Sequence, residues 1–197
     1  MRMSKEKPVV RTDQELIELF QHGDQRAFDE LVQRYERQIR TLCRYYLPHP
    51  PDIQDAAQDT FVRAYQALGK FEPRAKFSTW LYRIAINQCL NTLRAQRRRR
   101  WMQPFSTLHN GDEEMLFESK EVHTPLQKIE QKERIALVRA ALAKLPQEQR
   151  AVVILHRYQG LSYQEIAEIM GISLAAVESR LHRAKLKLAA LLAAYVS

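Results

Sequence analysis

The sequence has few glycines and few signs of β-strands. Only five of its 197 residues are glycine, and the alternation of apolar and polar residues that marks a half-buried strand is scarce. Apolar residues recur instead at helical spacing through nearly the whole chain. The sequence therefore predicts an all-α protein.

The motifs of metal sites and of common catalytic sites are missing as well. The two cysteines, Cys43 and Cys89, each lie inside an apolar helical pattern and form no CxxC pair. The six histidines form no HExxH pattern, and there is no P-loop, glycine-rich phosphate cradle or nucleophile elbow. We expect a protein that is not an enzyme and has no metal or cofactor, with both cysteines buried and reduced.

No long hydrophobic run is present. No stretch approaches the roughly 18 consecutive apolar residues that a membrane-spanning helix needs, and the start, MRMSKEKPVVRTDQE, lacks the apolar core of a signal peptide. We expect a soluble, cytoplasmic protein without stable membrane insertion.

Positive charge is abundant and unevenly placed. The formal net charge is +8. Residues 1–100 hold 19 Lys and Arg against 12 Asp and Glu, residues 101–130 hold 2 against 6, and residues 131–197 hold 10 against 5. Two basic blocks thus flank an acidic connector, which suggests a polyanionic partner for each block. Ribosomal and membrane-surface proteins are also basic, so charge alone does not choose the partner.

Helical periodicity divides the chain into two parts. Four helices are expected in the first part, over residues 12–21, 25–47, 52–68 and 78–97, the last continued by the arginines at 97–100. Periodicity fails between residues 101 and 124, which predicts a flexible acidic linker. Helices resume after Pro125 and at Pro146. The predicted domains are residues 1–100 and 125–197, joined by the linker at 101–124.

The stretch LSYQEIAEIMGISLAAVESRLHRAK, residues 161–185, predicts a helix-turn-helix. Ser162 and Glu165 form a capping box, and Gly171 stands where the chain must turn tightly. Ser173 caps a second helix whose buried stripe is Val177, Leu181, Ala184 and Leu188. An ordinary helical hairpin with a solvated basic face is the alternative. In a major groove, the N-terminal half of this second helix would meet base edges while later basic residues meet phosphates.

Several strings in order resemble one protein family: DIQDAAQDTFVRAY, FSTWLYRIAINQCLNTLRAQRRRR, LPQEQRAVVILHRYQGLSYQEIAEIMGIS and VESRLHRAK. Together they are similar to the extracytoplasmic-function group of bacterial sigma factors, over nearly the whole chain. The resemblance implies a subunit that binds core RNA polymerase, directs it to promoter DNA and helps to melt the DNA. It also implies a stress or envelope response and an anti-sigma factor as a partner. The first domain would melt the promoter, the linker would lie inside the polymerase, and the second domain would read the minus-thirty-five element.

The resemblance also assigns residues of the first domain. On the third helix, Asp55, Gln58 and Asp59 would dock on a coiled coil of the polymerase, although Asp52 and Asp55 also favour a helix N-terminus through its dipole. The remaining residues concern the minus-ten element. Phe71 and Asn87 would form a pocket for a flipped base, Arg74 and Lys76 would hold the displaced strand, and Arg97, Arg98, Arg99 and Arg100 would grip duplex phosphates. Core packing is the alternative for Phe71 and the preferred interpretation for Trp80.

On the predicted recognition helix, the expected promoter contacts are Ala175, Glu178, Ser179, His182, Arg183 and Lys185. Many relatives carry a basic residue in place of Glu178 and an aspartate in place of Asn91, so those two contacts do not carry over. Glu178 either accepts a hydrogen bond from a cytosine amino group or orients Arg183 or His182.

Two other classes of function compete with a sigma factor. A stand-alone helix-turn-helix regulator would explain the second domain but would leave WLYRIAIN and the acidic third helix without a role. An enzyme lacks any supporting motif, as described above.

Overall fold

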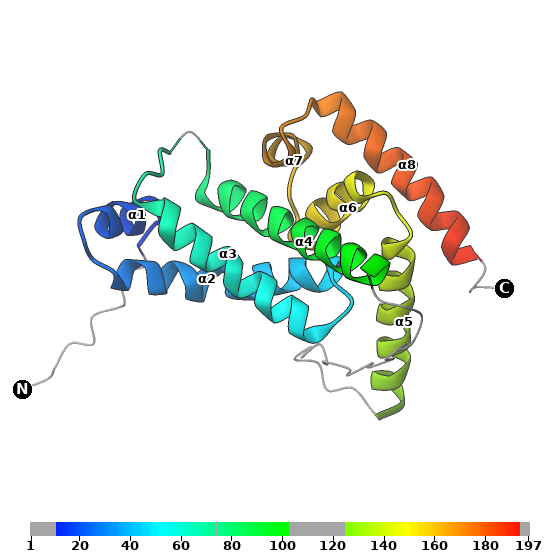
Figure 1. Ribbon diagram of the computed structural model, residues 1–197. Helices are drawn as coiled ribbons and strands as arrows, with labels where there is room; N and C mark the ends of the chain where they lie inside the picture. Colours follow the sequence, from blue (N-terminus) through cyan, green and yellow to red (C-terminus); the bar gives the residue numbers. More distant parts are fainter. Residues whose placement is uncertain (1–10, 74, 103–124, 194–197) are drawn as a thin grey trace, which may run out of the picture.

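The computed structural model describes residues 11–73, 75–102 and 125–193, with only the backbone described for 100–102 and 125–132. These residues form eight helices and no strand (Figure 1), which confirms the predicted all-α fold. The helices are α1 Asp13–Gln21, α2 Arg26–Tyr46, α3 Pro50–Leu68, α4 Phe77–Met102, α5 Pro125–Ala143, α6 Gln147–Gln159, α7 Tyr163–Met170 and α8 Leu174–Ala193.

Helices α1 to α4 form the N-terminal unit. Thr12 caps α1, and Glu15 completes the capping box. The helix α3 begins at Pro50 rather than Asp52, because proline lacks an N–H group that the first turn does not need. The helix α4 runs on through the arginine run to Met102. The α2 residues Leu31, Ile39 and Leu42 are almost fully buried against the neighbouring helices.

Helices α5 to α8 form the C-terminal unit. The sequence placed Pro146 in the first turn of α6, but Pro146 is the N-cap and the helix begins one residue later, at Gln147. Gly160 and Gly171 end α6 and α7 in the left-handed conformation, with φ of 67° and 64°. The predicted stripe on α8 is confirmed, since Val177, Leu181 and Ala184 are buried and Leu188 packs against the core.

The two units lie against each other. In Figure 1 the end of α2 meets α6, and α4 runs beside α7. The buried apolar residues of both units form one continuous cluster. The predicted acidic linker and Arg74 fall outside the described residues. Among the helices described, none is both long and apolar enough to cross a membrane.

Candidate nucleic-acid and polymerase interfaces

The turn between α7 and α8 fixes the direction of α8. The N–H groups of Gly171 and Ile172 both donate to the Ala167 carbonyl, at 3.1 Å for Ile172. The Ser173 hydroxyl then accepts a hydrogen bond from the Ala176 N–H at 3.2 Å. Because both helix ends are satisfied locally, α8 is held at a defined angle to α7.

All six predicted minus-thirty-five residues are exposed on α8. Residues 175, 178, 179, 182 and 185 are spaced three and four apart, so their side chains share one face of the helix. Arg180 lies next to this face, and its Nη2 forms an ion pair with Glu148 Oε2 of α6 at 2.7 Å. Its guanidinium therefore supports the contact between α6 and α8.

Arg183 is oriented by Ser179. Its Nη2 donates to the Ser179 hydroxyl at 3.1 Å and its Nε to the Ser179 carbonyl at 3.3 Å. Glu178 is exposed and has no hydrogen bond or ion pair with any described residue. The proposed orienting of Arg183 by Glu178 is not seen in the free chain, and the reading of a cytosine by Glu178 stays a prediction.

An aromatic cluster precedes and opens α4. The Phe71 ring is tilted against Trp80 with centroids 5.0 Å apart, and it meets Phe77 edge-on at 6.2 Å. Phe71 and Trp80 are both partly buried against the core, so Trp80 packs as preferred and Phe71 has a packing role whatever else it does. Asn87 is exposed seven residues after Trp80, which places it on the same face of α4.

The basic residues predicted to contact the minus-ten element, as far as the structure describes them, lie in two places. Arg97, Arg98 and Arg99 are exposed near the end of α4, and Arg100 continues the helix. Lys76 is exposed at the start of α4, where its Nζ lies 2.7 Å from Glu165 Oε1 of α7. The hydrogen bonds that Lys76 and Ser162 donate lower the pKa of Glu165 to about 2. The Glu165 carboxylate in turn raises the pKa of Lys76.

The acidic residues of α3 divide between structure and surface. Asp52 accepts a hydrogen bond from Gln96 Nε2 at 2.7 Å, so it joins α3 to α4. Asp55 and Asp59 are exposed, with Asp59 only 3.4 Å from Gln88 Nε2. Gln58 lies on the same side of the helix and borders a groove.

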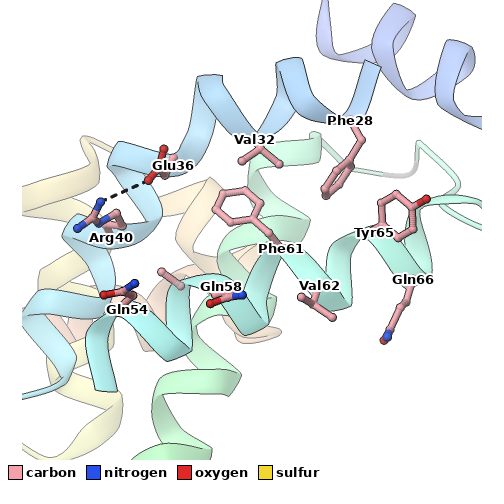
Figure 2. A pocket seen from close by; sticks show the side chains of 11 residues that line it. Phe28, Val32, Glu36, Arg40, Gln54, Gln58, Phe61, Val62, Tyr65 and Gln66 are labelled. Atoms are coloured by element: carbon pink, nitrogen blue, oxygen red, sulfur yellow. Dashed lines mark hydrogen bonds and ion pairs between the residues drawn. The ribbon is translucent and has the colours of Figure 1, made fainter. Parts of the chain in front are cut away.

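The groove between α2 and α3 was not found from the sequence. It has a volume of about 650 Å³. Figure 2 shows Val32 and Phe61 facing each other across it, with Phe28 and Tyr65 in edge-on contact at 5.2 Å and the Glu36–Arg40 ion pair at its rim. The lining residues are Phe28, Val32, Glu36, Arg40, Gln54, Ala57, Gln58, Phe61, Val62, Tyr65 and Gln66.

Two residues could have signalled this groove. Val62 is 46% exposed and Tyr65 41% exposed, and both lie off the buried stripe of α3. Phe61 is only partly buried because it lines the groove. Within the described ranges, no group of three or more His, Cys, Asp or Glu side chains is placed to hold a metal ion.

Comparisons with known proteins match both helical units. The family model for sigma-70 region 2 matches residues 31–99, and the model for sigma-70 region 4 matches residues 135–188. The RNA polymerase sigma-H factor of Pseudomonas aeruginosa is 39% identical over 177 residues, which cover 88% of this chain and 90% of that protein. The ECF RNA polymerase sigma-E factor of Escherichia coli K12 is 40% identical over 178 residues, which cover 88% and 91%. The chain belongs to the extracytoplasmic-function (ECF) sigma factors.

Solved structures agree with this family. This sigma factor superimposes on CnrH, solved in complex with the cytosolic domain of CnrY, with a TM-score of 0.68 and 32% identity over 92% of this chain and 97% of that one. The sigma factor RpoE of Bartonella quintana, solved with the anti-sigma factor NepR, shares the fold with a TM-score of 0.63 and 22% identity over 84% and 96%. The family consists of transcription initiation factors, and this sigma factor directs RNA polymerase to promoters in a stress or envelope response.

The region 2 match spans the α3 surface, the aromatic cluster and Asn87, and the region 4 match spans the exposed face of α8. The residues predicted for the minus-ten element and those predicted for the minus-thirty-five element therefore lie on different units. The sequence did not indicate a role for Arg83 of α4. Its guanidinium donates hydrogen bonds to the Glu168 and Ile169 carbonyls of α7, and backbone carbonyls leave no signal in a sequence.

Proposed function

We propose that core RNA polymerase docks on the groove between α2 and α3 of this sigma factor. The observation that carries the proposal is an exposed apolar groove beside exposed carboxylates. Val62 and Tyr65 offer apolar surface, while Asp55 and Asp59 offer negative charge nearby on α3. An amphipathic helical partner with basic flanks would bury the first and pair with the second.

The start of α4 would carry promoter melting. A flipped base needs an aromatic or apolar wall and an amide that can donate and accept hydrogen bonds on its edge. Phe71 and Trp80 supply rings, and Asn87 supplies an exposed amide on the same face of α4. Arg97 to Arg100 would hold duplex phosphates near the minus-ten element, and Arg74 and Lys76 the displaced strand.

The exposed face of α8 would read the minus-thirty-five element. Ala175, Glu178 and Ser179 lie in its N-terminal half, where a recognition helix meets base edges. His182, Arg183 and Lys185 follow within two turns and would contact the DNA backbone or neighbouring bases. The predicted domains, residues 1–100 and 125–197, would engage the two promoter elements separately, with the linker at 101–124 inside the polymerase.

An anti-sigma factor would complete the set of partners. CnrH was solved with CnrY, and the Bartonella RpoE with the anti-sigma factor NepR. We infer that the same groove that serves core polymerase is open to such an inhibitor. A stand-alone regulator is not favoured by any observation, since it would leave the α2–α3 groove without a use.

The proposal is tested by transcription in vitro. Purified protein is added to core polymerase and promoter DNA, and specific transcripts are expected. Asp59→Arg and Val62→Asp should weaken core association while the far-ultraviolet circular dichroism stays unchanged. Glu133→Arg, on the exposed surface of α5, is the matched control. Absence of both a stable core complex and initiation would refute a sigma role.

Promoter melting is tested separately with Asn87→Ala. This variant should bind core polymerase normally and should produce less open complex, measured by permanganate reactivity of unpaired thymines. A template with a pre-melted minus-ten region should restore transcription by Asn87→Ala. If the pre-melted template gives no rescue, Asn87 does not act in melting.

A further inference from the structure

The side chain of Gln21 joins α1 to the loop that precedes α4. Gln21 is the last residue of α1. Its Nε2 donates one hydrogen bond to the Leu68 carbonyl at 3.1 Å and another to the Phe71 carbonyl at 3.0 Å. A primary amide nitrogen carries two N–H groups, so both donors are used and the two acceptors fix the orientation of the amide. Gln21 therefore holds the end of α3 and the backbone of Phe71 at once.

The loop at residues 69–76 connects α3 to α4 and carries Phe71. The Phe71 N–H donates to the Leu68 carbonyl at 3.0 Å, and the Gln21 amide satisfies the Phe71 carbonyl. Because both of its backbone groups are bonded, Phe71 has a defined position although it lies in a loop. Its ring is thereby brought to 5.0 Å from the Trp80 ring, measured between centroids.

The other rings of the aromatic cluster are fixed by separate contacts. Phe77 is buried, and its ring meets Tyr35 of α2 edge-on with centroids 5.4 Å apart. The Tyr35 hydroxyl donates to Asp13 of α1. The Trp80 ring lies on α4 and is 5.7 Å from the Phe77 ring. Two of the three rings are thus held by helices, whereas Phe71 stands in the loop and depends on the contact from the end of α1.

The helix α1 is a firm support for this contact. Leu16 and Ile17 are buried, and the Phe20 ring meets Tyr65 of α3 edge-on with centroids 5.2 Å apart. Figure 1 shows α1 beside the end of α3, where the loop begins. The region 2 family model matches residues 31–99, so α1 precedes the matched range. The match therefore gives the end of α1 no role, although it contacts the loop directly.

We propose that Gln21 is a positioning residue for promoter melting, which holds the Phe71 wall in place so that a flipped base meets a preformed pocket. This inference rests on the proposed function of Phe71 and Asn87. Flipping a base already costs the energy of unstacking it. A wall that had to be ordered at the same moment would add the entropy of fixing the loop backbone. Gln21 removes that second cost in advance, and it acts through Phe71 without contacting DNA.

Strands that lack single bases measure base capture directly. The full-length protein is bound to core polymerase, and the complex is titrated against a fluorescent non-template strand of a promoter that the wild type transcribes. Anisotropy gives the affinity for the intact strand and for a series of strands with one abasic site each. At the captured position the wild type should lose affinity about tenfold, because one base no longer stacks on the aromatic rings. The ratio of intact to abasic affinity at that position is the abasic penalty.

Gln21→Ala should lower the abasic penalty about fivefold, by weakening binding of the intact strand and leaving binding of the abasic strand unchanged. Gln21→Glu keeps the size of the side chain but sets an acceptor against two carbonyl acceptors, so its penalty should fall at least as far. Repulsion between its charge and DNA affects both strands equally and cancels in the ratio. The matched control is Gln14→Ala, which removes the same residue type from the same helix. Gln14 Nε2 donates within α1 to Glu18 Oε1 at 2.7 Å, so this variant should match the wild type.

Two results would overturn the role of Gln21: an abasic penalty in Gln21→Ala equal to that of Gln14→Ala, or equal weakening of the intact and abasic strands. A loss of core association in Gln21→Ala and Gln21→Glu would also overturn it, since Gln21 would then support the fold as a whole. Failure of the proposed function looks different. The wild type itself would then show no position at which an abasic site lowers the affinity, or a penalty that Asn87→Ala leaves unchanged.

Discussion

Glu165 performs two tasks that substitution can separate. Its Oε2 accepts hydrogen bonds from the Ser162 N–H at 3.0 Å and the Ser162 hydroxyl at 2.9 Å, which completes the capping box of α7. Its Oε1 pairs with Lys76. Glutamine also serves as the third residue of a capping box, so Glu165→Gln keeps the cap and removes the charge, whereas Glu165→Ala removes both.

The expected losses in the free energy of unfolding depend on how exposed the Lys76–Glu165 ion pair is. The Lys76 side chain is 73% exposed, so its ion pair should contribute only about 0.2–1 kcal/mol. A helix cap contributes typically about 1 kcal/mol. At pH 7 we therefore expect Glu165→Gln to lower the free energy of unfolding by about 0.5 kcal/mol. Glu165→Ala should lower it by roughly 1.5 kcal/mol in total.

The pH dependence adds a second test. The folded pKa of Glu165, about 2, lies below its ordinary value of 4.5. Its charge therefore stabilises the fold fully above pH 4.5, and this contribution is lost as the pH falls towards 2. The difference between wild type and Glu165→Gln should shrink over that window, while the difference between the two variants should not change, because neither side chain titrates.

Urea unfolding followed by circular dichroism at pH 7, 4 and 3 measures both differences. Lys76→Met removes the ion pair from the other side and should match Glu165→Gln at pH 7. The reasoning fails if Glu165→Gln costs as much as Glu165→Ala, since the charge would then outweigh the cap. It also fails if the wild-type advantage over Glu165→Gln is equal at pH 7 and pH 3.

Three further predictions use other positions. Gly171→Ala, at φ 64°, should cost about 1–2 kcal/mol in urea unfolding, whereas Gly69→Ala, at φ −60°, should be neutral or stabilise by up to about 1 kcal/mol. Cys43 and Cys89, fully buried with sulfurs 3.6 Å apart, should react with a thiol reagent only after unfolding, and rapid labelling of the native protein would contradict their burial. Glu178→Gln and Glu178→Ala should change preference at one base pair of minus-thirty-five variants if Glu178 reads a cytosine; uniform weakening at every position would instead indicate an orienting role.

Helix positions were largely predictable because burial imposes a period on apolar residues. The stripe on α8 and the two capping boxes show this, since each depends on residues close in sequence. The ends of the helices were less predictable where one residue type can either end a helix or begin one. Pro48 directly follows the last residues of α2, whereas Pro50 begins α3, so prolines between two helices indicate a boundary without showing to which helix each proline belongs.

For the candidate polymerase site, the sequence predicted individual exposed residues but not the groove beside them. Resemblance placed Asp55, Gln58 and Asp59 on α3, and they are exposed. The groove beside them arises from how α2 and α3 pack, which leaves Phe61 half-covered and Tyr65 exposed. Periodicity distinguishes an apolar face from a polar one, but it does not say which apolar side chains stay uncovered after packing.

The contacts that Arg83, Arg139 and Arg150 make between the two units could not be predicted for a different reason. Their acceptors are backbone carbonyls, which every residue carries. A sequence pattern therefore shows that an arginine is present, but it does not show which carbonyl the arginine meets once the two units have packed.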